Sequence, residues 1–297
     1  MYRKAIEELF AWKSSLRRKP LVIKGARQVG KTWLMKEFAK VAYQDFLYLS
    51  FDKDGEAAKV FSDTKNPKQI LERLSMIRGR KILPGETLVL FDEIQECPHA
   101  LGSLKYFNEE ANEYHIIAAG SLLGTYLANP TSYPVGKVNI LNMYPLTFEE
   151  FLAATDMGMH QYFESIKSAN DYVPAFHLRM LEHYRKYLVI GGMPECVLSW
   201  TENANPQDIT AIQAELVALY ESDFTKHNAK ISSGRILQVF RSIVPQLAKE
   251  NNEKFMYVAI AKSARAKDFE DAIEWLVSSG IVYRILNITK NEYPLKA

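Results

Sequence analysis

Short apolar runs alternate with amphipathic segments in the first half of the chain. Unbroken apolar runs predict strands at 21–23, 46–51, 88–91, 116–119 and 138–141. Between the strands, apolar residues recur every three or four positions, which predicts helices near 2–17, 33–39, 55–62, 67–78 and 98–111. Strands that alternate with helices indicate βαβ units, and strands without polar alternation indicate a sheet covered on both faces. We therefore expect an α/β fold with a parallel sheet over roughly 20–145.

From about residue 147 the pattern becomes helical. Apolar residues at helical spacing predict helices at 148–152, 159–169, 174–190, 207–227 and 234–249. The segment Gly191-Gly192-Met193-Pro194 interrupts them as a strong break. Residues 255–297 suggest a small helical unit closed by a strand at 281–285. The chain is therefore expected to comprise three parts, 1–146, 147–250 and 251–297, the last of them winged-helix-like.

Composition is that of a soluble globular protein. The chain has 297 residues, 47% of them apolar and 24% charged, with a net charge of +2, so no global field demands nucleic acid or an acidic membrane. Neither a signal peptide nor an apolar run of about 18 residues occurs, which argues against a membrane span. Its two cysteines have no metal-ligand spacing. We expect a cytoplasmic protein.

The turn after the first predicted strand carries a phosphate-binding pattern. Residues 25–32 satisfy G-x-x-x-x-G-K-[ST] and read Gly25, Ala26, Arg27, Gln28, Val29, Gly30, Lys31 and Thr32. Glycines let successive backbone N–H groups face phosphates, and the next helix directs its positive end there. Lys31 supplies a charge for the β- and γ-phosphates, and Thr32 a hydroxyl for Mg²⁺. A glycine-rich turn without function is the alternative, which the strand before and the helix after disfavour.

Two acidic residues follow the third predicted strand. Its apolar run carries Asp92 to the carboxyl edge of the sheet, where the carboxylate can hold Mg²⁺. Glu93 comes next and can polarise the water that attacks a γ-phosphate. Ser121 ends the fourth strand, either as a hydrogen-bonding partner of the phosphate or water or as a turn serine or helix cap. The alternative for Asp92 and Glu93 is a pair of surface carboxylates.

The chain resembles a family of uncharacterised bacterial and archaeal predicted ATPases of the AAA+ superfamily. The resemblance lies in residues 25–32, 88–95 and 119–121, and above all in the segments 144–151 and 191–195, which read Tyr-Pro-Leu-Thr-Phe-Glu-Glu-Phe and Gly-Gly-Met-Pro-Glu. It implies an ATPase domain, a helical region, a winged-helix-like unit and then a C-terminal domain of unknown function. By the family pattern, Lys31 and Thr32 bind phosphate and metal, Asp92 binds metal and Glu93 activates water. The chain ends where the last domain should begin, so we expect a fragment.

AAA+ enzymes usually carry an arginine that stabilises the charge of the transition state. The candidates in this chain are Arg179, Arg185, Arg235, Arg241 and Arg265. Arg265 is favoured because it lies in a turn that could face the nucleotide, although each of these is individually more typical of a surface arginine. Arg27, within the loop, could reach over the nucleotide or to a neighbouring subunit, or could be solvated.

The expected function is ATP binding and Mg²⁺-dependent hydrolysis that drives a conformational change on an unidentified protein partner. A nucleotide-dependent switch with little turnover and a DNA-associated ATPase are the alternatives. The helix at 268–278 carries four carboxylates and no lysine or arginine, so DNA binding by it is disfavoured. A homo-oligomer is left open. Because no N-K-x-D motif occurs, ATP is favoured over GTP.

Overall fold

The computed structural model of the chain describes residues 1–121, 136–226, 232–249, 255–260 and 265–285. The chain divides into two compact units, Met1–Leu219 and Tyr220–Ala297. The boundary between the units therefore falls within a helix, α11 Pro206–Lys226. The division predicted from sequence, at 146/147 and 250/251, remains a prediction.

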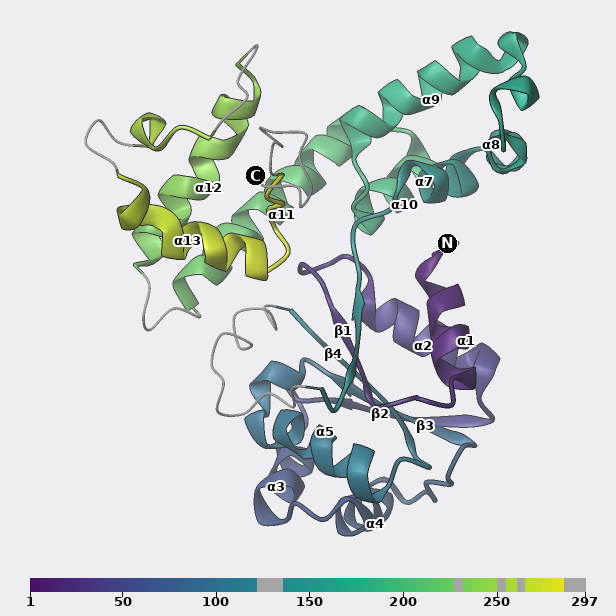
Figure 1. Cartoon of the computed structure of the whole chain (residues 1–297), viewed down its shortest axis with the longest axis vertical. Coiled ribbons are helices and arrows are strands. Elements are labelled where there is room, and N and C mark those ends of the chain that lie inside the picture. The colour runs from purple at the N-terminus through teal and green to yellow at the C-terminus, as the bar shows by residue number, and fades with distance from the viewer. Residues whose placement is uncertain (122–135, 227–231, 250–254, 261–264, 286–297) are drawn as a thin grey trace, which may run out of the picture. The chain divides into compact units, whose positions relative to one another are not determined.

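The first unit is built on a parallel sheet of five strands in the order β2-β3-β4-β1-β5 (Figure 1). The strands are β1 Leu21–Lys24, β2 Asp45–Ser50, β3 Thr87–Asp92, β4 His115–Gly120 and β5 Asn139–Asn142. All five lie where the apolar runs predicted them, within one or two residues. β1 lies between β4 and β5, so the strands are not in sequence order. This parallel sheet confirms the expected α/β fold of a P-loop nucleoside triphosphatase.

Helices cover both faces of this sheet. On one face lie α3 Gly55–Asp63, α4 Pro67–Arg78 and α5 Pro98–Glu110, and on the other lie α1 Ala5–Ser14 and α2 Lys31–Ala42 (Figure 1). A short 3₁₀ turn, η1 Ile94–Glu96, follows β3. Every residue of β3 is buried, which explains its unbroken apolar run. The main core contains edge-on aromatic pairs, with ring centroids 5.5 Å apart for Phe51 and Phe61 and 5.4 Å for Phe61 and Phe91.

A connecting segment leads from the sheet to a group of helices within the same unit. This segment, residues 143–147, joins β5 to α7 Phe148–Thr155, and it is followed by α8 Met157–Ser165, η2 Ala169–Asp171, η3 Pro174–Phe176, α9 His177–Ile190, α10 Pro194–Asn203 and α11 Pro206–Lys226. Helix α7 begins at a capping box in which Thr147 and Glu150 satisfy each other's backbone N–H groups. The sequence analysis missed α10, because Pro194 was interpreted as part of a break; proline is tolerated in the first turn of a helix, where it stands here.

The described part of the second unit is helical. It contains α12 Ser233–Leu247, the 3₁₀ turn η4 Tyr257–Ala259 and α13 Ala266–Ser278. Phe224 packs edge-on against Phe240 and Trp275, with ring centroids 5.2 and 5.5 Å away. The prediction of a strand at 281–285 is wrong, because these residues form none in the structure. Gly280 has φ +74°, and the amides of Ile281 and Val282 both donate to the carbonyl of Leu276, so the chain turns back on the helix end instead of pairing with a strand.

With that strand absent among the described residues, a winged-helix-like unit is not confirmed. Within the described ranges, no helix has the length and apolar character needed to cross a membrane.

Candidate functional site

The predicted site residues of the first unit, from Gly25 to Ser121, meet at the carboxyl edge of the sheet. Lys24, the last residue of β1, lies in register with Gly120, the last residue of β4. β3 ends at Asp92, in register with Ser50 at the end of β2. The loop 25–30 leaves β1 at this edge and runs directly into α2. Parallel strands thus bring residues that are 60 to 100 positions apart in sequence to one place.

The glycines of the loop are required by its geometry. A Cβ on Gly25 would lie 2.2 Å from the carbonyl oxygen of Met143, so no other residue fits without a shift of the backbone. Gly30, the residue before α2, has φ +94°, a conformation that residues with side chains rarely adopt. Gln28 also adopts a left-handed backbone, with φ 64°. The loop therefore has the curled shape that turns backbone N–H groups toward a bound anion.

Lys31 is held inside the loop. Its side chain is buried, and Nζ donates to the carbonyl oxygens of Gly25 at 2.9 Å and Ala26 at 2.7 Å. Burial lowers the pKa of Lys31 to about 8, nearby Glu93 and Asp92 oppose the shift, and Arg27 adds to it. Among the described residues, the ammonium thus has only carbonyl partners at hydrogen-bonding distance, and phosphate oxygens would offer stronger, charged ones.

Asp92 and Thr32 are in direct contact. The Thr32 hydroxyl donates to Asp92 Oδ2 at 2.6 Å, and the phenol of Tyr48 donates to the same oxygen at 2.8 Å. Asp92 is 4% exposed. A hydroxyl and a carboxylate that meet at a protected sheet edge are the oxygen donors that Mg²⁺ accepts, so these residues fit the expected metal.

Within the part of the chain that the structure describes, Glu93 has two side-chain hydrogen-bonding partners. Gln95 Nε2 donates to Glu93 Oε2 at 2.5 Å, and the Ser121 hydroxyl donates to the same oxygen at 3.3 Å. Glu93 adopts φ 49°, which costs a residue with a side chain about 1–2 kcal/mol. Ser121 is 1% exposed. The structure thus brings Ser121 to Glu93, as a role at the site requires; the alternative as a helix cap concerns residues 122–123, outside the described ranges.

Sequence reasoning missed two of these side chains, Tyr48 and Gln95. Tyr48 lies within a strand whose apolar run marks it as a core element, and its hydroxyl was the available signal. Gln95 follows the acidic pair closely and is buried. Because glutamine is seldom buried without a partner, its burial indicates a polar contact, which is the one to Glu93.

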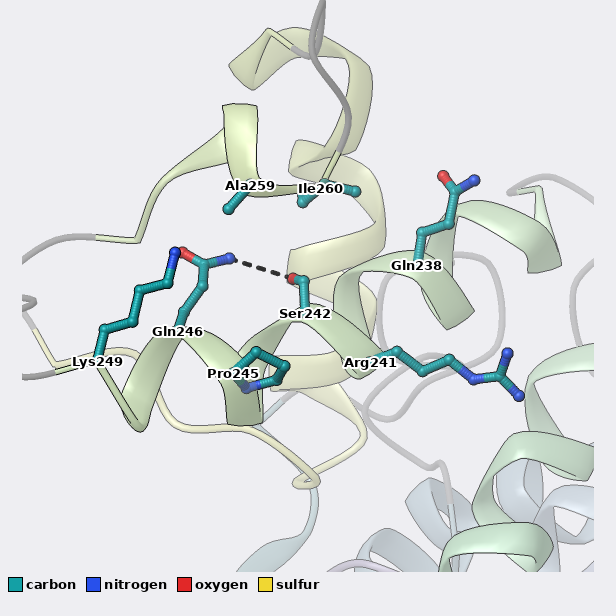
Figure 2. Close-up of a pocket in the computed structure, with 8 residues that line it drawn as sticks. All are labelled: Gln238, Arg241, Ser242, Pro245, Gln246, Lys249, Ala259 and Ile260. Carbon is teal, nitrogen blue, oxygen red and sulfur yellow. Dashed lines mark hydrogen bonds between the residues drawn. The ribbon is translucent and has the colours of Figure 1, made fainter.

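The arginines proposed as transition-state groups have varied surroundings. Arg179 pairs with Asp156 at 2.5 Å. Arg241 bonds both carboxylate oxygens of Glu221 at 2.8 Å, and in Figure 2 it extends away from a hollow of about 360 Å³ in the second unit. In addition to Arg241, the residues that line this hollow are Gln238, Ser242, Pro245, Gln246, Lys249, Ala259 and Ile260. Arg265 is exposed immediately before α13, and its role remains a prediction.

Comparisons with known protein families match two domains to the chain. Residues 17–152 match a family described as "AAA domain", and residues 181–297 match a "Domain of unknown function (DUF8612)". None of the curated proteins compared is detectably similar to the chain in sequence.

One of the solved structures that resemble the chain supports its fold. A Walker-type ATPase of Pyrococcus abyssi superposes with a TM-score of 0.55 at 16% identity, covering 93% of this chain and 89% of that one. The Orc1 protein of Aeropyrum pernix in complex with DNA gives a TM-score of 0.41 at 14% identity, covering 95% of this chain and 85% of that one. AMPPCP-bound DnaA from Aquifex aeolicus gives 0.30 at 16% identity, covering 93% and 85%. Only the first of these TM-scores is high enough to indicate a shared fold.

Proposed function

Because the chain matches an AAA domain followed by a domain of unknown function, we propose that it binds ATP and hydrolyses it with Mg²⁺. The proposal rests on one observation above all. Thr32 and Asp92 meet at 2.6 Å beside a glycine-constrained loop, and Glu93 follows at the same edge. The cycle would change the conformation of the helical part of the chain and so act on an unidentified protein partner.

The loop and α2 bind the triphosphate. Backbone N–H groups of residues 25–31 and the positive end of α2 face the anion, and Lys31 transfers its hydrogen bonds from loop carbonyls to phosphate oxygens. Thr32 and Asp92 would hold Mg²⁺, with Tyr48 fixing the carboxylate. When bound, the ion neutralises charge on the β- and γ-phosphates.

Glu93 is the proposed base for the attacking water. Its carboxylate lies at the sheet edge and bonds Ser121 and Gln95. Both donors bond Oε2, so Oε1 can accept a hydrogen bond from water at the γ-phosphate. The Ser121 hydroxyl, which donates to Glu93 at 3.3 Å, can orient the water or the phosphate with its acceptor lone pairs. Arg265 remains the favoured arginine for the charge of the transition state, supplied from this chain or from a second copy.

Phosphate release from purified protein with ATP and Mg²⁺ tests the function directly. Lys31→Ala should abolish binding and release, and Glu93→Gln should retain ATP binding but lower turnover by about a hundredfold or more. Glu96→Gln, an exposed glutamate three positions away, is the matched control and should hydrolyse ATP normally. Unchanged release in Lys31→Ala would show that the activity resides elsewhere.

One observation favours a second function, a nucleotide-dependent switch with little turnover. Gln95 and Ser121 both donate to Glu93 Oε2 and so restrict the rotation of the carboxylate that a base needs to follow its water. Stoichiometric retention of ATP without phosphate release would establish the switch. In that case Ser121→Ala together with Gln95→Ala should raise turnover, because the carboxylate would be released.

A further inference from the structure

Arg3 is a buried side chain at the start of the chain that reaches the phosphate loop. It lies before α1 and is 5% exposed. Nη1 donates to the carbonyl oxygen of Val29 in the loop at 3.2 Å, and Nη2 donates to the carbonyl oxygen of Tyr144 at 2.6 Å. One guanidinium thus bridges the loop and the connecting segment 143–147, two stretches without regular secondary structure whose carbonyls need donors.

The same guanidinium pairs with the first turn of α7. Arg3 Nε lies 3.3 Å from Oε1 of Glu150, which is 4% exposed. Glu150 also accepts from the backbone N–H of Lys4 at 2.8 Å and of Thr147 at 2.9 Å. The carboxylate therefore caps α7 and at the same time ties the N-terminal segment to this helix. Burial lowers the pKa of Arg3, and Glu150 opposes the shift.

Backbone contacts close the same junction. The Met143 amide donates to the carbonyl of Lys24 at 2.6 Å, and the Leu146 amide donates to the carbonyl of Gly192 at 2.6 Å. A Cβ on Gly30 would lie 3.6 Å from both Met143 Cε and Pro194 Cγ, and 4.0 Å from Arg3 Nη1. The two segments that carry the family resemblance, 144–151 and 191–195, therefore meet behind the phosphate loop.

We propose that Arg3 is a positioning residue: it holds the loop in its phosphate-binding shape and, through Glu150, makes the loop and α7 respond to each other. The response to ATP rests on the proposed function, whereas the support of the ligand-free loop does not. An arginine suits the position because its donors point in several directions at once, which an ammonium on a flexible stem does not reproduce.

Arg3→Lys separates this role from the stability of an ion pair. Lysine keeps the positive charge opposite Glu150 but lacks the planar pair of donors that reaches the carbonyls of Val29 and Tyr144. A second variant, Arg3→Gln with Glu150→Gln, removes both charges, so that no buried charge is left unpaired. Lys4→Gln is the control, because it breaks an exposed pair with Glu149, 3.1 Å long, at the same junction.

Amide hydrogen exchange measured with and without a non-hydrolysable ATP analogue, beside the dissociation constant, tests the proposal. In the wild-type protein the analogue should slow exchange in both the loop 25–31 and α7. Arg3→Lys and the double variant should exchange faster in the ligand-free loop, bind the analogue about tenfold more weakly for the loss of one hydrogen bond, and lose the response of α7. Lys4→Gln should match wild type.

Wild-type loop exchange and affinity in a folded Arg3→Lys or double variant would overturn the proposal. If the wild-type protein fails to bind the analogue, the proposed function fails. The exchange of the ligand-free loop then still decides whether Arg3 supports it.

Discussion

The charge of Lys31 depends on the burial of its side chain. Burial lowers its pKa to about 8, so a part of the lysine is neutral at pH 8.5 in the ligand-free protein. Phosphate oxygens favour the charged form and raise the pKa again. ATP binding at pH 8.5 should therefore take up a fraction of a proton, and affinity should fall as pH rises through 8. Calorimetric titration in buffers of different ionisation enthalpy measures the uptake, because the terminal phosphate is already ionised at this pH.

Lys31→Arg is the control for this proton. Arginine stays charged throughout the range, so any variant that still binds ATP should show no uptake. Below pH 7 the uptake should vanish in the wild-type protein as well, since Lys31 is then charged before binding. The same uptake in Lys31→Arg at pH 8.5 would assign the proton to another group.

The phenol of Tyr48 fixes the carboxylate expected to hold Mg²⁺. Its hydroxyl donates to Asp92 Oδ2 at 2.8 Å, and burial raises the pKa of Tyr48 to about 12, so it remains a donor at neutral pH. Tyr48→Phe should raise the Mg²⁺ concentration for half-maximal hydrolysis about tenfold, as the loss of a partner behind a metal ligand commonly does. A titration of Mg²⁺ at saturating ATP measures this change.

Excess Mg²⁺ should restore turnover in Tyr48→Phe, because the base and the loop are intact. Tyr106→Phe, on the outer helix α5, should leave the titration unchanged. If Tyr48→Phe lowers turnover equally at every Mg²⁺ concentration, the phenol acts on the chemistry and not on the metal.

At the scale of elements, the contact between the connecting segment and the turn before α10 depends on Gly192. A Cβ there would lie 2.2 Å from the carbonyl oxygen of Leu146. Gly192→Ala should therefore destabilise the first unit by about 1–3 kcal/mol, the usual cost of overpacking. Urea unfolding followed by circular dichroism measures it.

Gly158→Ala is the matched substitution for that experiment. Gly158 lies in α8, where the nearest atom to a new Cβ is Asp156 Oδ1 at an ordinary 3.5 Å. Alanine favours a helix over glycine by up to about 1 kcal/mol, so this variant should be as stable as wild type or more so. Equal stability of Gly192→Ala and wild type would show that the turn relaxes without cost.

Elements with a simple pattern were predictable from the sequence, and contacts between distant residues were not. Five apolar runs gave the five strands, and the motif gave the loop, because both depend on residues close in the chain. The pattern placed a strand at 281–285, where hydrogen bonds to the helix end took its place. Arg3 and Tyr48 escaped because their roles depend on partners 26 and 44 positions away.

At the scale of the whole molecule, the division into two units predicts how ATP stabilises the protein. The described groups proposed to bind phosphate and metal, from Gly25 to Ser121, all lie in the first unit. Calorimetry should show two transitions, of which an ATP analogue at a hundred times its dissociation constant stabilises the first unit by about 2.7 kcal/mol. Lys31→Ala should remove this response. An equal rise of both transitions would show that the units unfold as one.

Acid stability should depend on His115, a histidine at the opposite edge of the sheet. His115 begins β4, where Arg18 donates to its Nε2. Because a guanidinium only donates, Nδ1 carries the proton and donates to the Tyr43 oxygen at 2.6 Å. Burial lowers the pKa of His115 to about 4, and the charges of Arg18 and Lys13 add to the shift. The Trp12 ring lies 6.0 Å away. The histidine is therefore neutral in the folded state.

Between pH 6.5 and about 4 the unfolded chain binds a proton at His115 that the folded state does not, so stability should fall as pH falls through this window. The loss has a slope of up to about 1.4 kcal/mol per pH unit for one proton. His115→Gln should be less stable at pH 7, for the loss of its partners, but should show a shallower slope between pH 6.5 and 4 in urea unfolding. His99→Gln, an exposed histidine, should keep the wild-type slope. If His115→Gln keeps the wild-type slope, the acid sensitivity belongs to other groups. The pKa of His115 would then be the same in the folded and unfolded states.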